Sequence, residues 1–285
     1  MRSFLCFLLV CMVTCGCGTD ESGTVNNRLL GQGDFLALTY NVAGLPEPLS
    51  SSQPSVNTAQ ISPLLNSYDL VLVQEDFWYH KELTAQTEHP YRSVPMWEQP
   101  DLFHMGDGLN RLSVFKLGAL TRITWIECSG FLDCSSDCLT TKGFSVSQIE
   151  LEEGIAIDVY NLHMDAGSCD GDIVARRIQT EQLVEEINVR SSGKAVIVAG
   201  DTNLKFSRPD DMVSLDFLLL ETGVQDACRS LECGIELIDR ILFRSSDSVS
   251  LSPLSWELPA EFVDVEGNDL SDHIPVSVRF RWEGS

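Results

Sequence analysis

Short apolar runs recur along the chain, and most of them end in a polar side chain. Residues 196–200 (VIVAG) are all apolar or small and stop at Asp201, which is typical of a strand buried on both faces. Residues 143–151 and 155–163 instead alternate around a Glu-Glu-Gly turn, the pattern of a hairpin. The pattern predicts strands over 35–41, 69–75, 112–116, 121–127, 143–151, 155–163, 196–200, 235–243 and 275–282, and helices over 59–67, 78–88, 173–190 and 211–221.

Two sheets packed face to face, with helices outside, accommodate both the continuously apolar and the alternating strands. The segment before Asp272 is predicted to be a loop. In the helix that ends near Arg190, Arg176 lies along the apolar stripe, so we expect it to be paired with an acid.

Polar residues at the strand ends are the candidates for a functional site. They are Asn41, Glu75, His163, Asp201 with Asn203, and Asp272 with His273 before the last strand; Asp239 interrupts the strand 235–243. Metal-ligating and proton-transferring side chains that converge at one rim of a sheet sandwich are what a catalytic site needs. For Asp201 and Asn203 the alternative is a plain turn, because Gly, Asp and Asn all favour turns.

Composition narrows the classes of partner. The chain has 285 residues, is 44% hydrophobic and has a formal net charge of −23. Its length suits one large domain with an ample core. The acidic residues are spread along the chain, which argues against tight non-specific binding of nucleic acid.

The first residues are predicted to direct export. Arg2 precedes an apolar run over 4–13 that is too short to span a bilayer, and Cys17 follows Gly16, as in a bacterial lipoprotein signal. We expect a signal peptide over 1–17, a flexible tether over 18–33 and one domain over 34–285. Acylation of Cys17 would anchor a cell-envelope lipoprotein to a membrane surface, and ordinary cleavage would give a secreted protein.

Six cysteines remain outside the signal, which suggests disulfides in an exported chain. Cys228 and Cys233 are the expected pair of a short loop. The pairing of the other four stays open, and a zinc site is the rival interpretation for them: Cys128, Cys134, Cys138 and Cys169.

Six short motifs occur in an order that resembles a known superfamily. They are TYNVAGLP, LVLVQEDFW, YNLHMDAG, IVAGDTNL, IDRILF and SDHIPVSV, and they extend over residues 35–282. Together they resemble the endonuclease/exonuclease/phosphatase superfamily, with its deoxyribonuclease I-like fold. The segments NVAGLP, SDCLTTKGF and HMDAGS are most similar to the bacterial neutral sphingomyelinase branch, whereas Arg240 after Asp239 is more typical of the nuclease branch.

The resemblance implies an α/β fold: a four-layer sandwich of two packed, mostly antiparallel β-sheets flanked by helices. It also implies site roles. Glu75, with Asn41 and Asp272, would hold Mg²⁺, with Mn²⁺ or Ca²⁺ as alternatives. His273 would be the general base oriented by Asp239; Asp201 and Asn203 would place the water; His163 would donate to the phosphate.

The implied reaction is attack of water on a phosphodiester by a monomeric enzyme. A phospholipid head group is the favoured substrate, because of the branch resemblance and the acidic charge. An exported nuclease acting on DNA or RNA is the alternative, although no basic cluster appears. A catalytically silent surface-binding domain is a third hypothesis, disfavoured because every motif position is present. A lipid enzyme of this kind should also show an exposed apolar hairpin, but no obvious one appears, and residues 243–254 are rich in serine.

Overall fold

The computed structural model describes residues 31–47, 49–50, 53–97, 100 and 105–285. The predicted signal segment, its Cys17 and the tether as far as residue 30 lie outside the described residues. The end of the predicted tether belongs to the fold, because the first strand begins at Gln32 and pairs there with Glu283. None of the described helices combines the length and the apolar character needed to cross a membrane.

The described residues form thirteen strands and five α-helices. The strands are β1 (Gln32–Asn41), β2 (Leu70–Gln74), β3 (Tyr91–Arg92), β4 (Asn110–Ser113), β5 (Lys116–Leu117), β6 (Thr121–Thr124), β7 (Gly143–Glu152), β8 (Ile155–His163), β9 (Val196–Asp201), β10 (Gln225–Asp226), β11 (Asp239–Arg244), β12 (Val249–Glu257) and β13 (Val276–Gly284). The helices are α1 (Pro54–Leu64), α2 (His80–Thr84), α3 (Asp170–Arg190), α4 (Pro209–Thr222) and α5 (Ala227–Ser230), with 3₁₀ turns η1 (Leu65–Ser67) and η2 (Asp137–Leu139).

The strands form two mixed sheets. One has six strands in the order β12-β13-β1-β2-β4-β3, and the other has seven, in the order β10-β11-β9-β8-β7-β5 with β6 also paired to β7. The pairs β1–β2 and β8–β9 are parallel, and the remaining ladders of the described residues are antiparallel. The predicted fold class is therefore confirmed.

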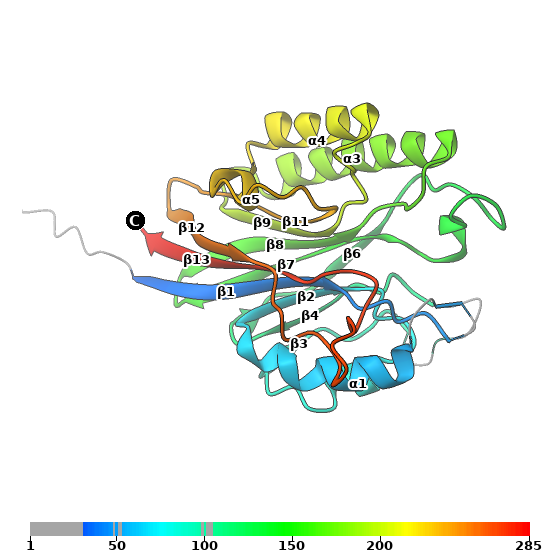
Figure 1. Ribbon diagram of the computed structural model, residues 1–285. Helices are drawn as coiled ribbons and strands as arrows, with labels where there is room; N and C mark the ends of the chain where they lie inside the picture. The colour runs from blue at the N-terminus through cyan, green and yellow to red at the C-terminus, as the bar shows by residue number, and fades with distance from the viewer. Residues whose placement is uncertain (1–30, 48, 51–52, 98–99, 101–104) are drawn as a thin grey trace, which may run out of the picture.

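Three apolar cores hold four layers together (Figure 1). The two sheets face each other across one core, to which Phe35, Ile157 and Phe280 contribute. Helices α3 and α4 cover the outer face of the seven-stranded sheet through residues such as Leu183 and Leu215. Helix α1 covers the six-stranded sheet, where Ile61 is fully buried. Because the apolar strands are covered on both faces, they lack a polar face in the sequence.

Three strands were missed in the sequence: the two-residue strands β3 and β10, and the longer β12. The segment predicted to be a loop before Asp272 contains β12, which lies at an edge of its sheet and pairs with β13. Its serines alternate with the buried Val249 and Leu251, and Pro253 sits next to a register shift. An edge strand tolerates proline because one side of its backbone needs no partner. The serine and proline content therefore hid a genuine strand.

Several predicted boundaries were also wrong, including those of β11 and α1. Strand β11 begins at Asp239 instead of running from residue 235, so Asp239 lies at the rim of the sheet rather than within a strand. Helix α1 covers Pro54–Leu64 instead of 59–67; Pro54 occupies its first position, and Pro63 falls in its last turn. Proline suits the first turn of a helix because the amide hydrogen that it lacks has no partner there.

The predicted pairing of Arg176 is confirmed. Its fully buried guanidinium lies 2.9 Å from an Asp211 oxygen, which links α3 to α4. It also donates to the backbone carbonyls of Asp165, Ala166 and Gly167. This one side chain therefore connects two helices to the loop that follows β8.

We expect Arg176→Met to destabilise the protein by about 3 kcal/mol. The substitution removes one partner of a buried ion pair and leaves buried carbonyl groups without their hydrogen-bond donor. The neighbouring Arg177→Met is the matched control: Arg177 makes an exposed pair with Glu181, which contributes little. Urea unfolding of both variants measures the difference. Equal midpoints would show that the buried pair has no special role.

Candidate active site

Strand pairing brings the predicted residues to one rim of the sandwich. In the seven-stranded sheet, Asp201 pairs with His163 on one side and with Asp239 on the other. In the six-stranded sheet, Asn41 ends β1 opposite Gln74, and Glu75 follows directly. The carboxyl ends of β1, β2, β8 and β9 therefore meet with the beginning of β11.

His273 forms the centre of an acid–base arrangement. Its Nδ1 lies 2.8 Å from an Asp239 carboxylate oxygen, and its Nε2 lies 3.7 Å from Asp201. Burial opposes the charged imidazolium, but the hydrogen bond to Asp239 and the nearby Asp201 charge outweigh burial and raise the pKa of His273 to about 10. Asp239 thus fixes the ring so that Nε2 faces the site.

Asn41 joins the two sheets at the rim. Its side-chain nitrogen lies 3.0 Å from Glu75 Oε1 and 3.3 Å from Asp201 Oδ2, while its oxygen accepts from the Ala43 amide. In this orientation Asn41 is a donor that draws two carboxylates together. A metal-ligand role requires its oxygen to face the cation instead, because an amide nitrogen offers only donors.

The backbone at the rim adopts conformations that side chains seldom allow. Ala43, Glu75 and Asn203 have φ angles of 48°, 56° and 51°. Such left-handed residues cost on the order of 1–3 kcal/mol each and gather at functional sites, where the surrounding structure holds them in place. The Asn203 amide donates to Asp201, and its side chain donates to the Met164 carbonyl. The predicted turn and the predicted site therefore coincide.

Lys142 is a site residue that was not predicted. Its ammonium lies 3.0 Å from His163 Nε2, 2.6 Å from Asp137 Oδ1 and 3.3 Å from the Met164 carbonyl. Burial opposes its charge, but Asp137 and Glu75 outweigh burial and raise the pKa of Lys142 above its ordinary value. In the sequence, Lys142 belongs to the SDCLTTKGF segment. That segment contributed to the family resemblance, but no role was predicted for the lysine.

The lysine determines the state of His163. An ammonium only donates, so Nε2 of His163 must accept and its proton resides on Nδ1. Burial, then the charges of Lys142 and His273, lower the pKa of His163 well below its ordinary value. His163 is therefore neutral, and Lys142 is the buried cation on this side of the site.

Several groups at the rim offer oxygen or nitrogen atoms to a cation. Ligand atoms of Asp201, Asp239 and His273 lie within 4.8 Å of one another. Burial raises the pKa of Glu75, although Lys142 and Asn41 act against it, and burial together with Asp239 raises that of Asp201 to about 6. Carboxylates that are destabilised by burial gain from a nearby cation. Asp272 is exposed and accepts from the Ser271 hydroxyl at 3.5 Å.

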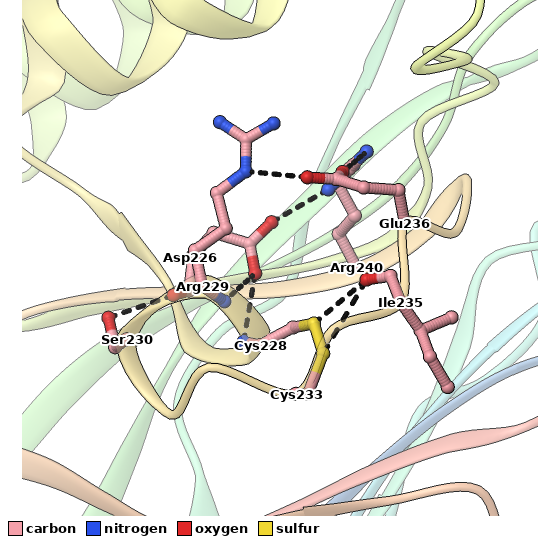
Figure 2. Close-up of a disulfide and its surroundings, with 8 residues drawn as sticks. All are labelled: Asp226, Cys228, Arg229, Ser230, Cys233, Ile235, Glu236 and Arg240. Atoms are coloured by element: carbon pink, nitrogen blue, oxygen red, sulfur yellow. Dashed lines mark hydrogen bonds and ion pairs between the residues drawn. A yellow bond between two sulfur atoms is a disulfide. The ribbon is translucent and has the colours of Figure 1, made fainter.

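Arg240 does not face the site as a free cation. It is buried, lies 2.8 Å from Asp226 and 2.9 Å from Glu236, and is held beside the loop closed by Cys228–Cys233 (Figure 2). Asp226 also caps α5 by accepting from its first amides. The residue that is more typical of the nuclease branch is thus neutralised by two acids.

Three disulfides account for the six cysteines. The predicted pair Cys228–Cys233 is confirmed, and the pairs Cys128–Cys138 and Cys134–Cys169 resolve the pairing that the sequence left open. The zinc interpretation is therefore wrong, because all four of its ligands are in disulfides. Disulfides are consistent with an exported protein.

Comparison with known proteins places this geometry in context. No protein-family model matches the chain. The sphingomyelinase of Mycobacterium tuberculosis is 37% identical over 96% of this chain and 56% of its own length.

Over nearly all of its length, the chain is therefore similar to a protein named a sphingomyelinase. It spans a little over half the length of that mycobacterial relative.

Solved structures support the same fold. A magnesium-bound beta toxin variant from Staphylococcus aureus has a TM-score of 0.63 at 17% identity, covering 86% of this chain and 99% of its own. Sphingomyelinase C from Streptomyces griseocarneus scores 0.62 at 16% identity, covering 89% and 100%. D. rerio TDP2 with a single-strand DNA product scores 0.64 at 18% identity, covering 87% and 98%. The chain thus has the deoxyribonuclease I-like fold.

Gly44 supports the Glu75 backbone and provides a test of the site. Its amide donates to the Glu75 carbonyl, and a Cβ at Gly44 would meet that oxygen at 2.4 Å. Gly44→Ala must therefore displace Glu75. We expect divalent-cation affinity to fall by about 10- to 100-fold, as when the support of a metal ligand is lost.

Isothermal titration with Mg²⁺ measures this loss. Gly118→Ala is the control, because a Cβ there would meet its nearest neighbour at an ordinary 3.4 Å. Unchanged affinity in Gly44→Ala would remove Glu75 from the cation site.

Proposed function

We propose that the protein is a metal-dependent phosphodiesterase that hydrolyses a phospholipid head-group ester, as a sphingomyelinase or phospholipase C does. The observation that carries the proposal is the His273–Asp239 pair, which directs His273 Nε2 toward Asp201, while Glu75 approaches His163 and Asn41 from the other sheet. The 37% sequence identity to a protein named a sphingomyelinase supports this substrate class.

The residues divide the reaction between them. His273 would take a proton from water, Asp239 would orient the imidazole and balance its charge, and Asp201 and Asn203 would place that water. The water oxygen forms a bond to phosphorus while the opposite ester bond breaks, and the leaving alkoxide takes up a proton. Lys142 lies where it can stabilise the charge that develops on the phosphate oxygens, with the neutral His163 holding its ammonium in place.

A magnesium ion suits the donor atoms of the site. Glu75 would be its principal ligand; Asn41, after rotation of its amide, and Asp272 are the further ligands proposed. Mg²⁺ prefers one or two carboxylates together with water, and Mn²⁺ or Ca²⁺ would use the same oxygens. When bound, the cation would neutralise a phosphate oxygen, stabilise the leaving alkoxide and favour the deprotonated form of His273.

The charges of the chain favour a lipid over a nucleic acid. The net charge is −23, and Arg240 is already paired with Asp226 and Glu236. Buried Arg111 donates to Ser145 and Ser147, and Arg122 pairs with Asp107. A nucleic-acid enzyme needs cations that can neutralise backbone phosphates, and these arginines are engaged elsewhere. A nuclease activity, like that suggested by the DNA product bound to D. rerio TDP2, is the second candidate.

The proposed location follows from the disulfides and the first residues. Three disulfides suit an oxidising compartment outside the cytoplasm. We propose export directed by residues 1–17 and a lipid anchor at Cys17. One acyl group binds membranes only weakly, so stable attachment would need several chains or a second contact.

A substrate panel tests the proposed function. We expect the protein with Mg²⁺ to release phosphocholine from sphingomyelin vesicles, to cleave bis-p-nitrophenyl phosphate slowly, and to leave plasmid DNA intact. EDTA should abolish both activities, and added Mg²⁺ should restore them. DNA cleavage without lipid turnover would establish the nuclease instead, and no EDTA-sensitive turnover of any substrate would favour a binding domain.

His273→Ala should lower turnover by about 10²- to 10⁴-fold, because it removes the proposed general base. His89→Gln is a suitable control: His89 Nε2 lies 2.7 Å from the Tyr68 carbonyl, at the opposite end of β2, and glutamine can still donate there. Circular dichroism confirms folding. Full activity in His273→Ala would show that another group accepts the proton.

A further inference from the structure

Loops at the catalytic rim expose large apolar side chains. One of them is the segment 126–139 between β6 and β7, which we call the stapled loop. Within it, Leu132 is 91% exposed and Phe131 is 66% exposed; Phe206, three residues after Asn203, is 62% exposed. Single exposed apolar residues are normal on soluble proteins, so the location of this group is what matters.

The stapled loop is fixed by covalent bonds and hydrogen bonds. Cys128–Cys138 closes it, and Cys134–Cys169 ties its centre to the start of α3. The Ser129 amide also donates to Asp165 Oδ2 at 2.7 Å. Its apolar tip is thus held away from the core, and contact with a partner would cost little ordering of the chain.

The same loop adjoins the catalytic groups. Asp137, near its end, holds the Lys142 ammonium that contacts His163. It leads into β7, whose beginning pairs with the end of β8, so it projects at the end of the sandwich to which β1 runs (Figure 1). The loop and the candidate catalytic groups therefore lie at the same end of the sandwich.

The segment between β11 and β12 is not an apolar hairpin of the kind expected of a lipid enzyme. The turn between β11 and β12 contains Ser245, Ser246 and Ser248, whose hydroxyl groups make hydrogen bonds within that segment. The stapled loop and the loop that follows β9 carry exposed apolar side chains instead: Phe131 and Leu132 in the first, and Phe206 in the second.

We propose that Phe131 and Leu132 of the stapled loop, with Phe206, dock the protein on a zwitterionic phospholipid bilayer and present the active site to its head groups. The inference rests on the proposed lipid substrate, because a scissile ester at head-group depth can be reached only if the rim faces the membrane. Apolar side chains that enter the boundary between head groups and acyl chains supply the affinity. The net charge of −23 selects against anionic lipids, which would repel the protein.

The test compares Phe131→Ser/Leu132→Ser with the unaltered protein. Both are prepared from the full chain with Cys17→Ser, so that an acyl anchor does not contribute. The matched control is Val213→Ser/Leu220→Ser on the outer face of α4, where these residues are 66% and 79% exposed. Flotation with vesicles of sphingomyelin, phosphatidylcholine and cholesterol, in EDTA, measures binding without turnover.

We expect the stapled-loop variant to bind these vesicles about 10- to 100-fold more weakly, since two large apolar side chains no longer enter the bilayer. Its turnover of vesicular sphingomyelin with Mg²⁺ should fall in proportion, while cleavage of soluble bis-p-nitrophenyl phosphate stays unchanged. The α4 variant should behave like the unaltered protein, Phe206→Ser should show a smaller loss, and phosphatidylglycerol in the vesicles should weaken binding of all forms.

The outcomes separate this inference from the proposed function. Equal vesicle binding and turnover by the stapled-loop variant and the unaltered protein would overturn the docking surface and leave the phosphodiesterase intact. Vesicle binding that depends on Phe131 and Leu132, without any hydrolysis of sphingomyelin, would support the docking surface and refute the proposed function. Equal losses in the stapled-loop and α4 variants would also overturn it, because the contact would then be non-specific.

Discussion

A polar contact between the two sheets determines whether the active site can form. Gln74 Nε2 donates to Asn161 Oδ1 at 2.7 Å, and Asn161 Nδ2 donates to the carbonyls of Val73 and Asn110. All of these groups are buried, so a shift of one sheet over the other would leave several of them unsatisfied, at a cost that apolar contacts do not impose. Gln74 precedes Glu75, and Asn161 lies on the same face of β8 as His163. The contact that fixes the sheets therefore fixes the distance between the two halves of the site.

The strained backbone at the rim depends on this framework. Glu75 and Ala43 both adopt left-handed conformations. The amide of Gly44, the residue after Ala43, donates a hydrogen bond to the Glu75 carbonyl. Such conformations persist only where surrounding contacts determine them, here the parallel pair β1–β2 and its polar support. The strain turns the Glu75 carboxylate out of the sheet and toward Asn41. A backbone conformation that is unfavourable on its own at Glu75 is thus part of the geometry of the candidate site.

The sequence predicted those parts of the site that follow from strand periodicity. His163 and Asp201 end clear apolar strands, and parallel pairing places such ends at one rim, so their proximity follows from the order of apolar and polar residues alone. Lys142 could not be placed in this way, because it follows a cysteine- and serine-rich segment with no periodicity, and its burial depends on contacts with His163 and Asp137. Strand β12 was hidden because an edge strand accepts serine and proline that an inner strand would not. Disulfide pairing likewise depends on where separate loops meet in space.

The balance of charge at the rim gives a physical reason for a cation. Four carboxylates, from Glu75, Asp137, Asp201 and Asp239, surround two cationic side chains, Lys142 and His273. Burial makes this excess of negative charge costly. The pKa values of Asp201 and His273 are both raised, and a raised pKa favours the protonated form, which carries less negative or more positive charge. A divalent ion would supply the missing positive charge and allow His273 to release its proton without destabilising Asp201 and Asp239. The acids that raise the pKa of His273 are therefore groups whose charge a cation would offset, so binding of the ion would lower that pKa.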